Sequence, residues 1–236
     1  MKDEIAILMA AGLGSRMRPL TEAVPKPLVK VCGKPMIETV LDALNKRGVS
    51  EIVIVTGYLG DQFESIREKY GNVRLVKNEY FETVNNISSI HAVTDLMRGR
   101  DLFICEADLY IDDPSVLEGE FDSCYFGKFV EGFSDDWVFE RDEKGRITRV
   151  GKGGTDCYNM CGISYFKKDD AGKIADAIDL AWGKEGYEDL FWDDVVDSIL
   201  GDVALTVHPI GTDDIIEIDT DDELKKVEEQ IGRKNK

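Results

Sequence analysis

Uninterrupted apolar runs alternate with amphipathic helical patterns through the first half of this chain. Glu4–Met9, Ile52–Val55 and Leu102–Cys105 have the near-continuous apolar character of strands that are buried on both faces. Between the first two runs, the apolar residues of Met36–Lys46 fall on one helical face, and Gly48 is a typical helix stop. This alternation predicts a mostly parallel sheet covered by helices on both faces.

Shorter patterns complete the expected order of elements. In the first half we predict a strand over Val73–Val76 and helices around Phe63–Tyr70 and Ile87–Met97. In the second half the predicted strands are Ser123–Phe129, Trp137–Arg141, Ile147–Gly151, Met160–Phe166, Ala204–Val207 and Ile215–Ile218, and the predicted helices are Ala171–Trp182, Leu190–Leu200 and Asp221–Ile231. The predicted fold class is therefore α/β, a Rossmann-like, mostly parallel central sheet with helices on both faces and a small antiparallel β lobe.

The chain is strongly acidic, with 47 Asp and Glu residues against 29 Lys and Arg residues and a formal charge of −18. Such a field repels nucleic acids and anionic membranes, so we expect neither as a partner. A phosphate-bearing ligand would also be repelled unless its site supplied basic groups and a metal ion. A cluster of basic residues is therefore informative in this chain.

The sequence features that bear on location all point to the cytoplasm. The longest apolar stretch near the start, Ile5–Ala11, is too short to span a bilayer and lacks the basic flank of a secretion signal. The five cysteines form no CxxC pair and no Cys/His cluster, so neither a disulfide framework nor a zinc site is indicated. We expect a cytoplasmic protein with reduced thiols, and its oligomeric state stays open.

A glycine-rich loop follows the first predicted strand. Gly12-Leu13-Gly14 matches neither the dinucleotide fingerprint nor the P-loop, and alone it would indicate only a tight turn. Arg16 and Arg18 follow at once, however, and Lys26 lies in a stretch stiffened by three prolines. Backbone N–H groups in such a loop approach phosphate oxygens closely, and the basic side chains add the charge that an acidic chain must supply locally. The loop therefore predicts a triphosphate-binding site.

The segment Leu8–Thr21, with Pro25–Leu28 and Gly33–Met36 after it, closely resembles the signature of the sugar-phosphate nucleotidyltransferase superfamily. Within that superfamily, the whole chain is similar to the bacterial phosphocholine cytidylyltransferases. The segments that carry this narrower resemblance are Asn78-Glu79-Tyr80, Asn85-Asn86, Glu106-Ala107-Asp108, Asp189–Asp193 and Glu217-Ile218-Asp219. The resemblance implies a fold of the nucleotide-diphospho-sugar transferase type in a single domain, residues 1–236. Residues 1–120 would form its nucleotide-binding half and residues 121–236 its acceptor-binding half.

The resemblance also implies the nucleotide and metal sites. Lys26, Arg16 and Asp108 would be the catalytic residues. Asp108, Asp219 and Glu217 would hold Mg²⁺, a hard cation that prefers carboxylate and phosphate oxygens. From sequence alone, aspartates at strand ends are as often turn formers or helix caps. The nucleotide would contact Leu8, Ala10, Ala11, Gly12, Gly14, Ser15, Arg16, Lys26, Asn85, Ser88 and Ser89. The stretch Asn85–Ser89 resembles the segment that faces the base in this superfamily.

Aromatic rings beside carboxylates in the second half suggest where the acceptor binds. Trp137 follows two aspartates, and Phe191-Trp192 precedes two more. Such a box suits a quaternary ammonium, with each ring contributing about 0.5–2 kcal/mol. From sequence alone, core packing and helix capping account for the same residues somewhat better. The resemblance favours an acceptor site formed by Trp137, Tyr187, Phe191, Trp192 and Asp194.

The resemblance implies that CTP and phosphocholine react to give CDP-choline and pyrophosphate. A phosphomonoester has a second pKa of about 6 and is mostly dianionic at neutral pH, so no general base is required. Three alternatives stay open: 2-aminoethylphosphonate as the acceptor, a sugar 1-phosphate as the acceptor, or a non-catalytic regulatory subunit that binds a nucleotide. The expected partners are CTP and a small phosphorylated cationic alcohol.

Overall fold

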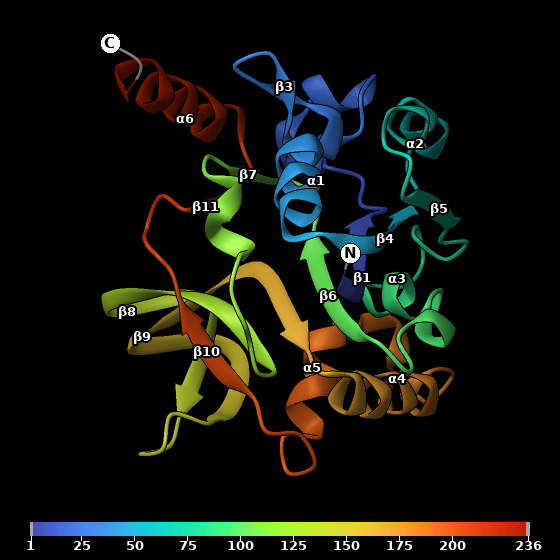
Figure 1. Cartoon of the computed structure of the whole chain (residues 1–236), viewed down its shortest axis with the longest axis vertical. Helices are drawn as coiled ribbons and strands as arrows, with labels where there is room; N and C mark the ends of the chain where they lie inside the picture. Colours follow the sequence, from blue (N-terminus) through green and yellow to red (C-terminus); the bar gives the residue numbers. More distant parts are fainter. Residues whose placement is uncertain (1, 235–236) are drawn as a thin grey trace.

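A seven-stranded sheet extends through both halves of the chain in the computed structural model, which describes residues 2–234 (Figure 1). Four neighbouring strands of this sheet are parallel, as the apolar runs predict. In spatial order they are β6 (Asp101–Glu106), β1 (Lys2–Ala10), β4 (Val49–Thr56) and β5 (Val73–Lys77). Their carboxyl ends lie along one edge of the sheet, which is where ligands of open α/β sheets bind.

The other three strands of the sheet come from the second half of the chain. They are β9 (Ile147–Phe166), antiparallel to β6, then β8 (Cys124–Arg141), antiparallel to β9, and β10 (Thr206–Pro209) at the edge. The prediction of four separate strands over residues 123–166 is wrong, because the structure joins them into two long ones. The polar stretch between Phe129 and Trp137 stays in the ladder because bulges absorb its irregular register.

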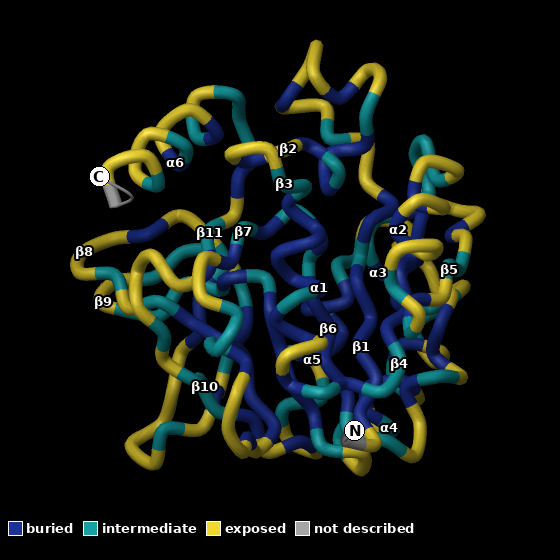
Figure 2. The backbone as a smooth tube through the Cα atoms, turned by 45° about the horizontal axis from the view of Figure 1, so that its top comes forward, coloured by how far each residue is buried: buried dark blue, intermediate teal, exposed yellow. Residues whose placement is uncertain are grey.

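Helices cover both faces of the sheet, as predicted. On one face lie α1 (Met36–Arg47) and α2 (Glu64–Lys69), and on the other lie α3 (Ile87–His91), α4 (Lys168–Ala181) and α5 (Trp192–Ser198). Successive side chains of β1 point to opposite faces, so Leu8 joins the core under α1 and Ile7 joins the core under α3. Figure 2 shows β1, β4 and β6 buried over most of their length.

Helix ends follow the local sequence in one case and depart from the prediction in another. The stop predicted at Gly48 is confirmed: this glycine has φ 88°, and its N–H donates to two carbonyls of the last turn of α1. The helix predicted over Ile87–Met97 is wrong in its second half. α3 ends at His91 because Val93 has the non-helical φ of −134°, and only a 3-10 turn, Thr94–Leu96, follows.

Two short antiparallel pairs and the last helix lie near the carboxyl edge of the parallel strands. β7 (Leu109–Ile111) follows β6 and pairs with β11 (Ile215–Glu217), so that Leu109 faces Glu217. A hairpin of β2 (Lys30–Val31) and β3 (Lys34–Pro35) shares a small core with α6 (Asp221–Lys234). The remaining 3-10 turns are Ser15–Met17, Leu20–Glu22, Lys26–Leu28, Gly60–Phe63, Pro114–Leu117 and Tyr187–Asp189.

The predicted fold class is confirmed: a mostly parallel central sheet has helices on both faces and an antiparallel β lobe built from β8 and β9. The final helix, α6, lies beside the β2–β3 hairpin, with which it shares a small core (Figure 1). Among residues 2–234, no helix has the length and apolar character needed to cross a membrane.

Candidate active site

The glycine-rich loop leaves the carboxyl end of β1 and closes against the segment that follows it. Gly14 has the left-handed φ of 61°, and a Cβ placed on it would lie only 2.9 Å from Lys26 Cβ. The hydroxyl of Thr21 donates to the Gly14 carbonyl at 2.7 Å. A residue without a side chain is therefore needed at position 14 for the loop to approach Lys26 this closely.

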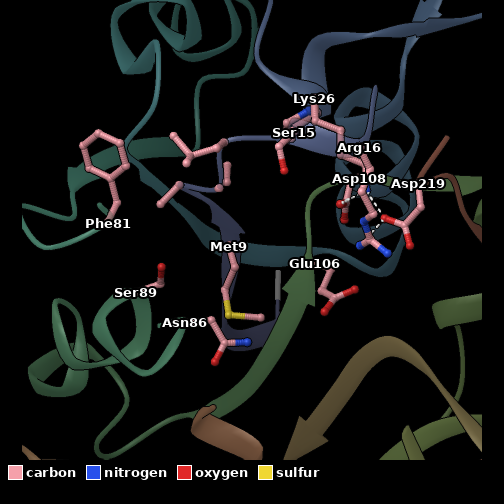
Figure 3. A pocket seen from close by; sticks show the side chains of 16 residues that line it. Met9, Ser15, Arg16, Lys26, Phe81, Asn86, Ser89, Glu106, Asp108 and Asp219 are labelled. Atoms are coloured by element: carbon pink, nitrogen blue, oxygen red, sulfur yellow. Dashed lines mark hydrogen bonds and ion pairs between the residues drawn. The ribbon is translucent and has the colours of Figure 1, made fainter. Parts of the chain in front are cut away.

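Lys26 is buried and bridges two carboxylates from distant parts of the chain. Its Nζ donates to Asp108 Oδ2 and to Asp219 Oδ1, both at 2.5 Å (Figure 3). Asp108 follows β6 and Asp219 follows β11, and the pairing of β7 with β11 brings the two together. Arg16 Nη2 adds an ion pair of 2.7 Å to Asp219 Oδ1. The three residues predicted to be catalytic therefore lie in one network of ion pairs.

The electrostatics of this network follow from its composition. Burial would lower the pKa of Lys26, but the charges and hydrogen bonds of Asp108 and Asp219 outweigh it and raise the pKa above its usual value, so the ammonium stays charged. The carboxylates of Asp108, Glu217 and Asp219 can each present an oxygen within 4.8 Å of the other two. Three carboxylates at that spacing form a donor set that suits a hard divalent cation.

These charges line one side of a cavity of about 400 Å³, a size typical of a small-molecule site (Figure 3). Of the residues predicted to bind the nucleotide, those that line this cavity are Ala10, Ala11, Gly12, Gly14, Ser15, Arg16, Lys26 and Ser89. Leu8 does not line it. Its side chain is fully buried in the core beneath the loop and packs between β1 and α1.

A smaller recess of about 170 Å³ adjoins this cavity and shares its wall at Ala11, Gly12 and Ser89. The other predicted base-facing residues, Asn85 and Ser88, line the recess. The amide Nδ2 of Asn78 donates to the hydroxyls of Ser88 at 2.8 Å and Ser89 at 3.2 Å, which fixes the orientation of the start of α3. The recess is polar on one side and has a phenylalanine ring, Phe81, on another.

The base-facing segment is hydrogen-bonded directly to the segment predicted to bind the acceptor. The backbone N–H of Asn85 donates to the Glu188 carbonyl at 2.8 Å. The Asn85 amide donates to the Asp189 carbonyl at 3.2 Å, and the Trp192 N–H donates to Asn86 Oδ1 at 2.9 Å. These bonds join residues that are more than 100 positions apart in the sequence.

The predicted acceptor residues do not come together in one box. Trp137 and Phe191 form an edge-to-face pair with ring centroids 5.2 Å apart. The Lys152 ammonium already lies over both rings, 6.0 Å from the Trp137 centroid and 5.8 Å from the Phe191 centroid. A second cation at these faces would therefore have to compete with Lys152.

The other three predicted acceptor residues have structural surroundings of their own. Trp192 is 3% exposed and stacks on Tyr125 in the core, with ring centroids 5.9 Å apart. Tyr187 packs edge-on against Trp182, at 4.8 Å. Asp194 accepts a hydrogen bond of 2.8 Å from the N–H of Phe191 and so caps α5. Packing and capping, the other interpretation of these residues, describe the surroundings of these three side chains, and their role in binding an acceptor stays a prediction.

Six residues that line the cavity are not among the predicted site residues: Met9, Leu13, Pro27, Phe81, Asn86 and Glu106. Glu106 ends β6, and burial raises the pKa of its carboxyl well above the usual range, with the charges of Glu217 and Asp108 adding to the effect. A signal for Glu106 exists in the sequence, since it stands two residues before Asp108 at the same strand end. No pattern identifies Phe81 in advance.

Comparison with known proteins agrees with this geometry. A model of the MobA-like NTP transferase domain matches residues 6–125, which include β1, the glycine-rich loop, Lys26 and Asp108. The chain belongs to this family. Its predicted membership of the nucleotidyltransferases is thereby confirmed, and three relatives that align with more than nine tenths of the chain are cytidylyltransferases.

This MobA-like NTP transferase is 48% identical over 220 residues to 2-aminoethylphosphonate cytidylyltransferase of Lancefieldella rimae. The aligned region covers 93% of this chain and 89% of that protein. It is 32% identical over 230 residues to choline-phosphate cytidylyltransferase of Streptococcus pneumoniae, covering 98% of this chain and 99% of that protein. A solved structure of CTP:phosphocholine cytidylyltransferase from Streptococcus pneumoniae superimposes with a TM-score of 0.89 over 97% of this chain and 99% of that chain. These relationships make the protein a cytidylyltransferase.

Proposed function

We propose that this cytidylyltransferase transfers CMP from CTP to 2-aminoethylphosphonate and releases pyrophosphate. The observation that carries the proposal is the 48% identity, over 93% of this chain, to a protein named for that activity. The site supports it independently. A primary ammonium is recognised by hydrogen-bond acceptors, which this cavity supplies as carboxylates, whereas a quaternary ammonium requires open aromatic faces.

In the proposed reaction an oxygen of the acceptor phosphonate attacks the α-phosphorus of CTP. A new P–O bond forms there, and the bond from the α-phosphorus to the bridging oxygen breaks, so that pyrophosphate leaves with that oxygen. Arg16 and the N–H groups of the glycine-rich loop hold the β- and γ-phosphates. Lys26 neutralises charge at the α-phosphate and the incoming phosphonate, and it needs no change of protonation because its pKa is raised. Catalysis then comes from positioning and charge neutralisation.

We also propose that Asp108 and Asp219, with Glu217 beside them, hold a Mg²⁺ ion with the triphosphate. The residues fit such an ion, since their carboxylate oxygens lie within 4.8 Å of one another and two of them already share one cation, the Lys26 ammonium. A bound Mg²⁺ would offset the negative charge that builds up on the phosphates. Removal of divalent ions with a chelator should abolish turnover, and added Mg²⁺ should restore it.

Phosphocholine is the second candidate acceptor. It is favoured by the pneumococcal relative, which aligns with 98% of this chain, and by the paired rings of Trp137 and Phe191. The placement of Trp192 in the core and of Lys152 over the remaining rings weighs against it. Because two faces that are already in contact with a lysine make a poor cage, we rank phosphocholine below 2-aminoethylphosphonate.

A pyrophosphate-release assay distinguishes these functions. CTP, UTP, dTTP, ATP and GTP are each combined with 2-aminoethylphosphonate, phosphocholine, phosphoethanolamine and a set of sugar 1-phosphates. We expect the highest kcat/KM with CTP and 2-aminoethylphosphonate. A clear preference for phosphocholine or for a sugar 1-phosphate would refute the proposed acceptor, and absence of turnover with every pair would favour a regulatory role.

A further inference from the structure

A second and much smaller cavity lies directly behind Glu106. Its volume is about 10 Å³, which is room for roughly one water-sized group. It shares Met9 and Glu106 with the large cavity, so these two side chains separate the two spaces. Four other residues that line this small cavity enter the argument: Tyr125, Met160, Trp192 and Asp193.

Within the described residues, the Glu106 carboxyl group lacks the ion pair or hydrogen bond that buried acids such as Glu4 have. Among residues 2–234, no hydrogen bond or ion pair reaches the Glu106 carboxylate, which extends from the tip of β6 into the large cavity (Figure 3). Lys26, a basic group whose charge acts on Glu106, is already bonded to Asp108 and Asp219. Such a position without a donor disfavours the charged form of the carboxyl group, and a bound cationic ligand would stabilise that form.

The absence of a side chain at Gly162 leaves the space that the Glu106 carboxylate occupies. A Cβ on Gly162 would lie 2.8 Å from Glu106 Oε2, and Gly162 has a φ of +73°. On the far side of the small cavity, Asp193 presents a second carboxylate, which accepts a hydrogen bond of 3.1 Å from the Tyr125 hydroxyl. The rings of Tyr125 and Trp192 complete an environment of two acids and two aromatic residues.

We propose that this small cavity receives the primary ammonium of the acceptor, with Glu106 as its direct ionic partner and Asp193 and the ring of Trp192 at the back. The proposal rests on the proposed function and names the residues that give it its specificity. An ammonium group is about the size of the water that this space would hold, whereas each methyl added to the nitrogen needs further volume. The cavity thus selects a primary over a quaternary ammonium by its size, and a cation over a neutral group by its charge.

The test compares wild type with Glu106→Gln on two acceptors that differ only by the amino group at this end: 2-aminoethylphosphonate and ethylphosphonate, which lacks it. We expect Glu106→Gln to raise the KM for 2-aminoethylphosphonate by about tenfold or more, because a charge-assisted hydrogen bond is lost. The KM for CTP and the kcat/KM for ethylphosphonate should change by a much smaller factor, because neither ligand has an amine for Glu106 to bind. The matched control is Glu118→Gln, whose carboxylate pairs with Lys46 on the surface 3.6 Å away. A Glu106→Gln enzyme that affects both acceptors equally, or neither, would overturn the proposal.

A second variant tests the size of the cavity without touching a charge. Met160→Ala removes part of its wall, and we expect it to improve the kcat/KM for N-methyl and N,N,N-trimethyl derivatives of 2-aminoethylphosphonate relative to the parent acceptor. Circular dichroism checks that both variants fold. If wild type prefers 2-aminoethylphosphonate but both variants keep its selectivity, this inference is wrong and the proposed function stands. If wild type uses phosphocholine instead, the proposed function itself is wrong.

Discussion

Lys26 is the residue on which most of the site depends. It is buried, bonded to Asp108 and Asp219, and packed against Gly14 through its Cβ. We expect Lys26→Ala to lower kcat for pyrophosphate release by about a hundredfold or more, because a preorganised charge at the reacting phosphates is lost. Lys34→Ala, which removes an exposed lysine that pairs with Asp42 in the same segment, serves as the control and should retain activity. Near-normal turnover of Lys26→Ala with an intact circular dichroism spectrum would contradict the assignment.

Asp193 connects the site to the pH dependence of stability. Burial raises the pKa of Asp193 to about 7, so its folded pKa lies above the value of an unfolded aspartate. The folded state then binds the proton more tightly, and the stabilisation present at low pH is lost as the pH rises from about 4 through 7.

Asp193→Asn removes this dependence while keeping a side-chain oxygen for Tyr125. We expect the variant to exceed wild type in melting temperature at pH 8 and to match it at pH 4, with a difference of about 1–4 kcal/mol in the free energy of unfolding at the higher pH. Thermal melts across that range measure it. Asp202→Asn, at an exposed aspartate, is the comparison and should show no such trend. Parallel melting curves for Asp193→Asn and wild type would show that the buried carboxyl does not titrate in this way.

At the residue scale, the charged residues of the site were easier to predict from the sequence than the contacts of its aromatic side chains. Arg16 and Lys26 are conspicuous in an acidic chain, and the structure places both in the network with Asp219. The orientation of Trp192 cannot be found in the same way, because a ring at the first turn of a helix faces the core or the site according to how the helix packs. That packing depends on Tyr125 and Phe166, which lie far away in the sequence.

At the scale of elements, the glycine-rich loop is a rigid connection between β1 and Lys26. Gly14→Ala places a methyl group 2.9 Å from Lys26 Cβ at a positive φ, so the loop must move away from the ion-pair network. We expect the KM for CTP to rise by about tenfold or more, since small displacements of binding groups are costly for phosphoryl transfer. Gly71→Ala is the control because Gly71 has open space around its Cα. Unchanged kinetics in Gly14→Ala, measured by pyrophosphate release, would mean that the loop tolerates the shift.

The elements themselves divide into those that local sequence determines and those that it does not. β1, β4 and β6 are continuous apolar runs, and α1 ends where a glycine follows, so each was predictable. β8 and β9 are long because their ladder continues through a polar, exposed stretch near Phe133 by means of bulges. Pairing with the neighbouring strand keeps that stretch extended, and the sequence of the stretch alone does not predict this pairing.

At the scale of the whole molecule, one buried arginine joins four parts of the fold. Arg47 of α1 forms a two-pronged ion pair with Glu4 of β1, both bonds being 2.8 Å, and donates to the carbonyls of Leu117 and Gly119. Its guanidinium also lies 5.2 Å from the ring centroid of Tyr165 in β9. This cluster lies at the opposite end of β1 from the glycine-rich loop, so it supports the sheet and not the chemistry.

Arg47→Met should lower the free energy of unfolding by about 3–5 kcal/mol, because it leaves Glu4 charged and unpaired in the interior. Denaturant unfolding measures the change, and the KM values of the fraction that remains folded should stay near wild type. Arg67→Met, which breaks the exposed pair with Glu64, should cost less than about 1 kcal/mol. A loss in Arg47→Met no larger than that in Arg67→Met would show that the Arg47–Glu4 pair contributes little.

The hydrogen bonds that join the base-facing segment to the acceptor segment have a thermodynamic consequence. Asn85 and Asn86 bond to the stretch from Glu188 to Trp192, so a ligand that orders one segment also orders the other. Binding free energies of two ligands on one protein are reciprocal: the factor by which CTP tightens the acceptor equals the factor by which the acceptor tightens CTP. We therefore expect the two substrates to bind cooperatively, with the same coupling factor measured from either side.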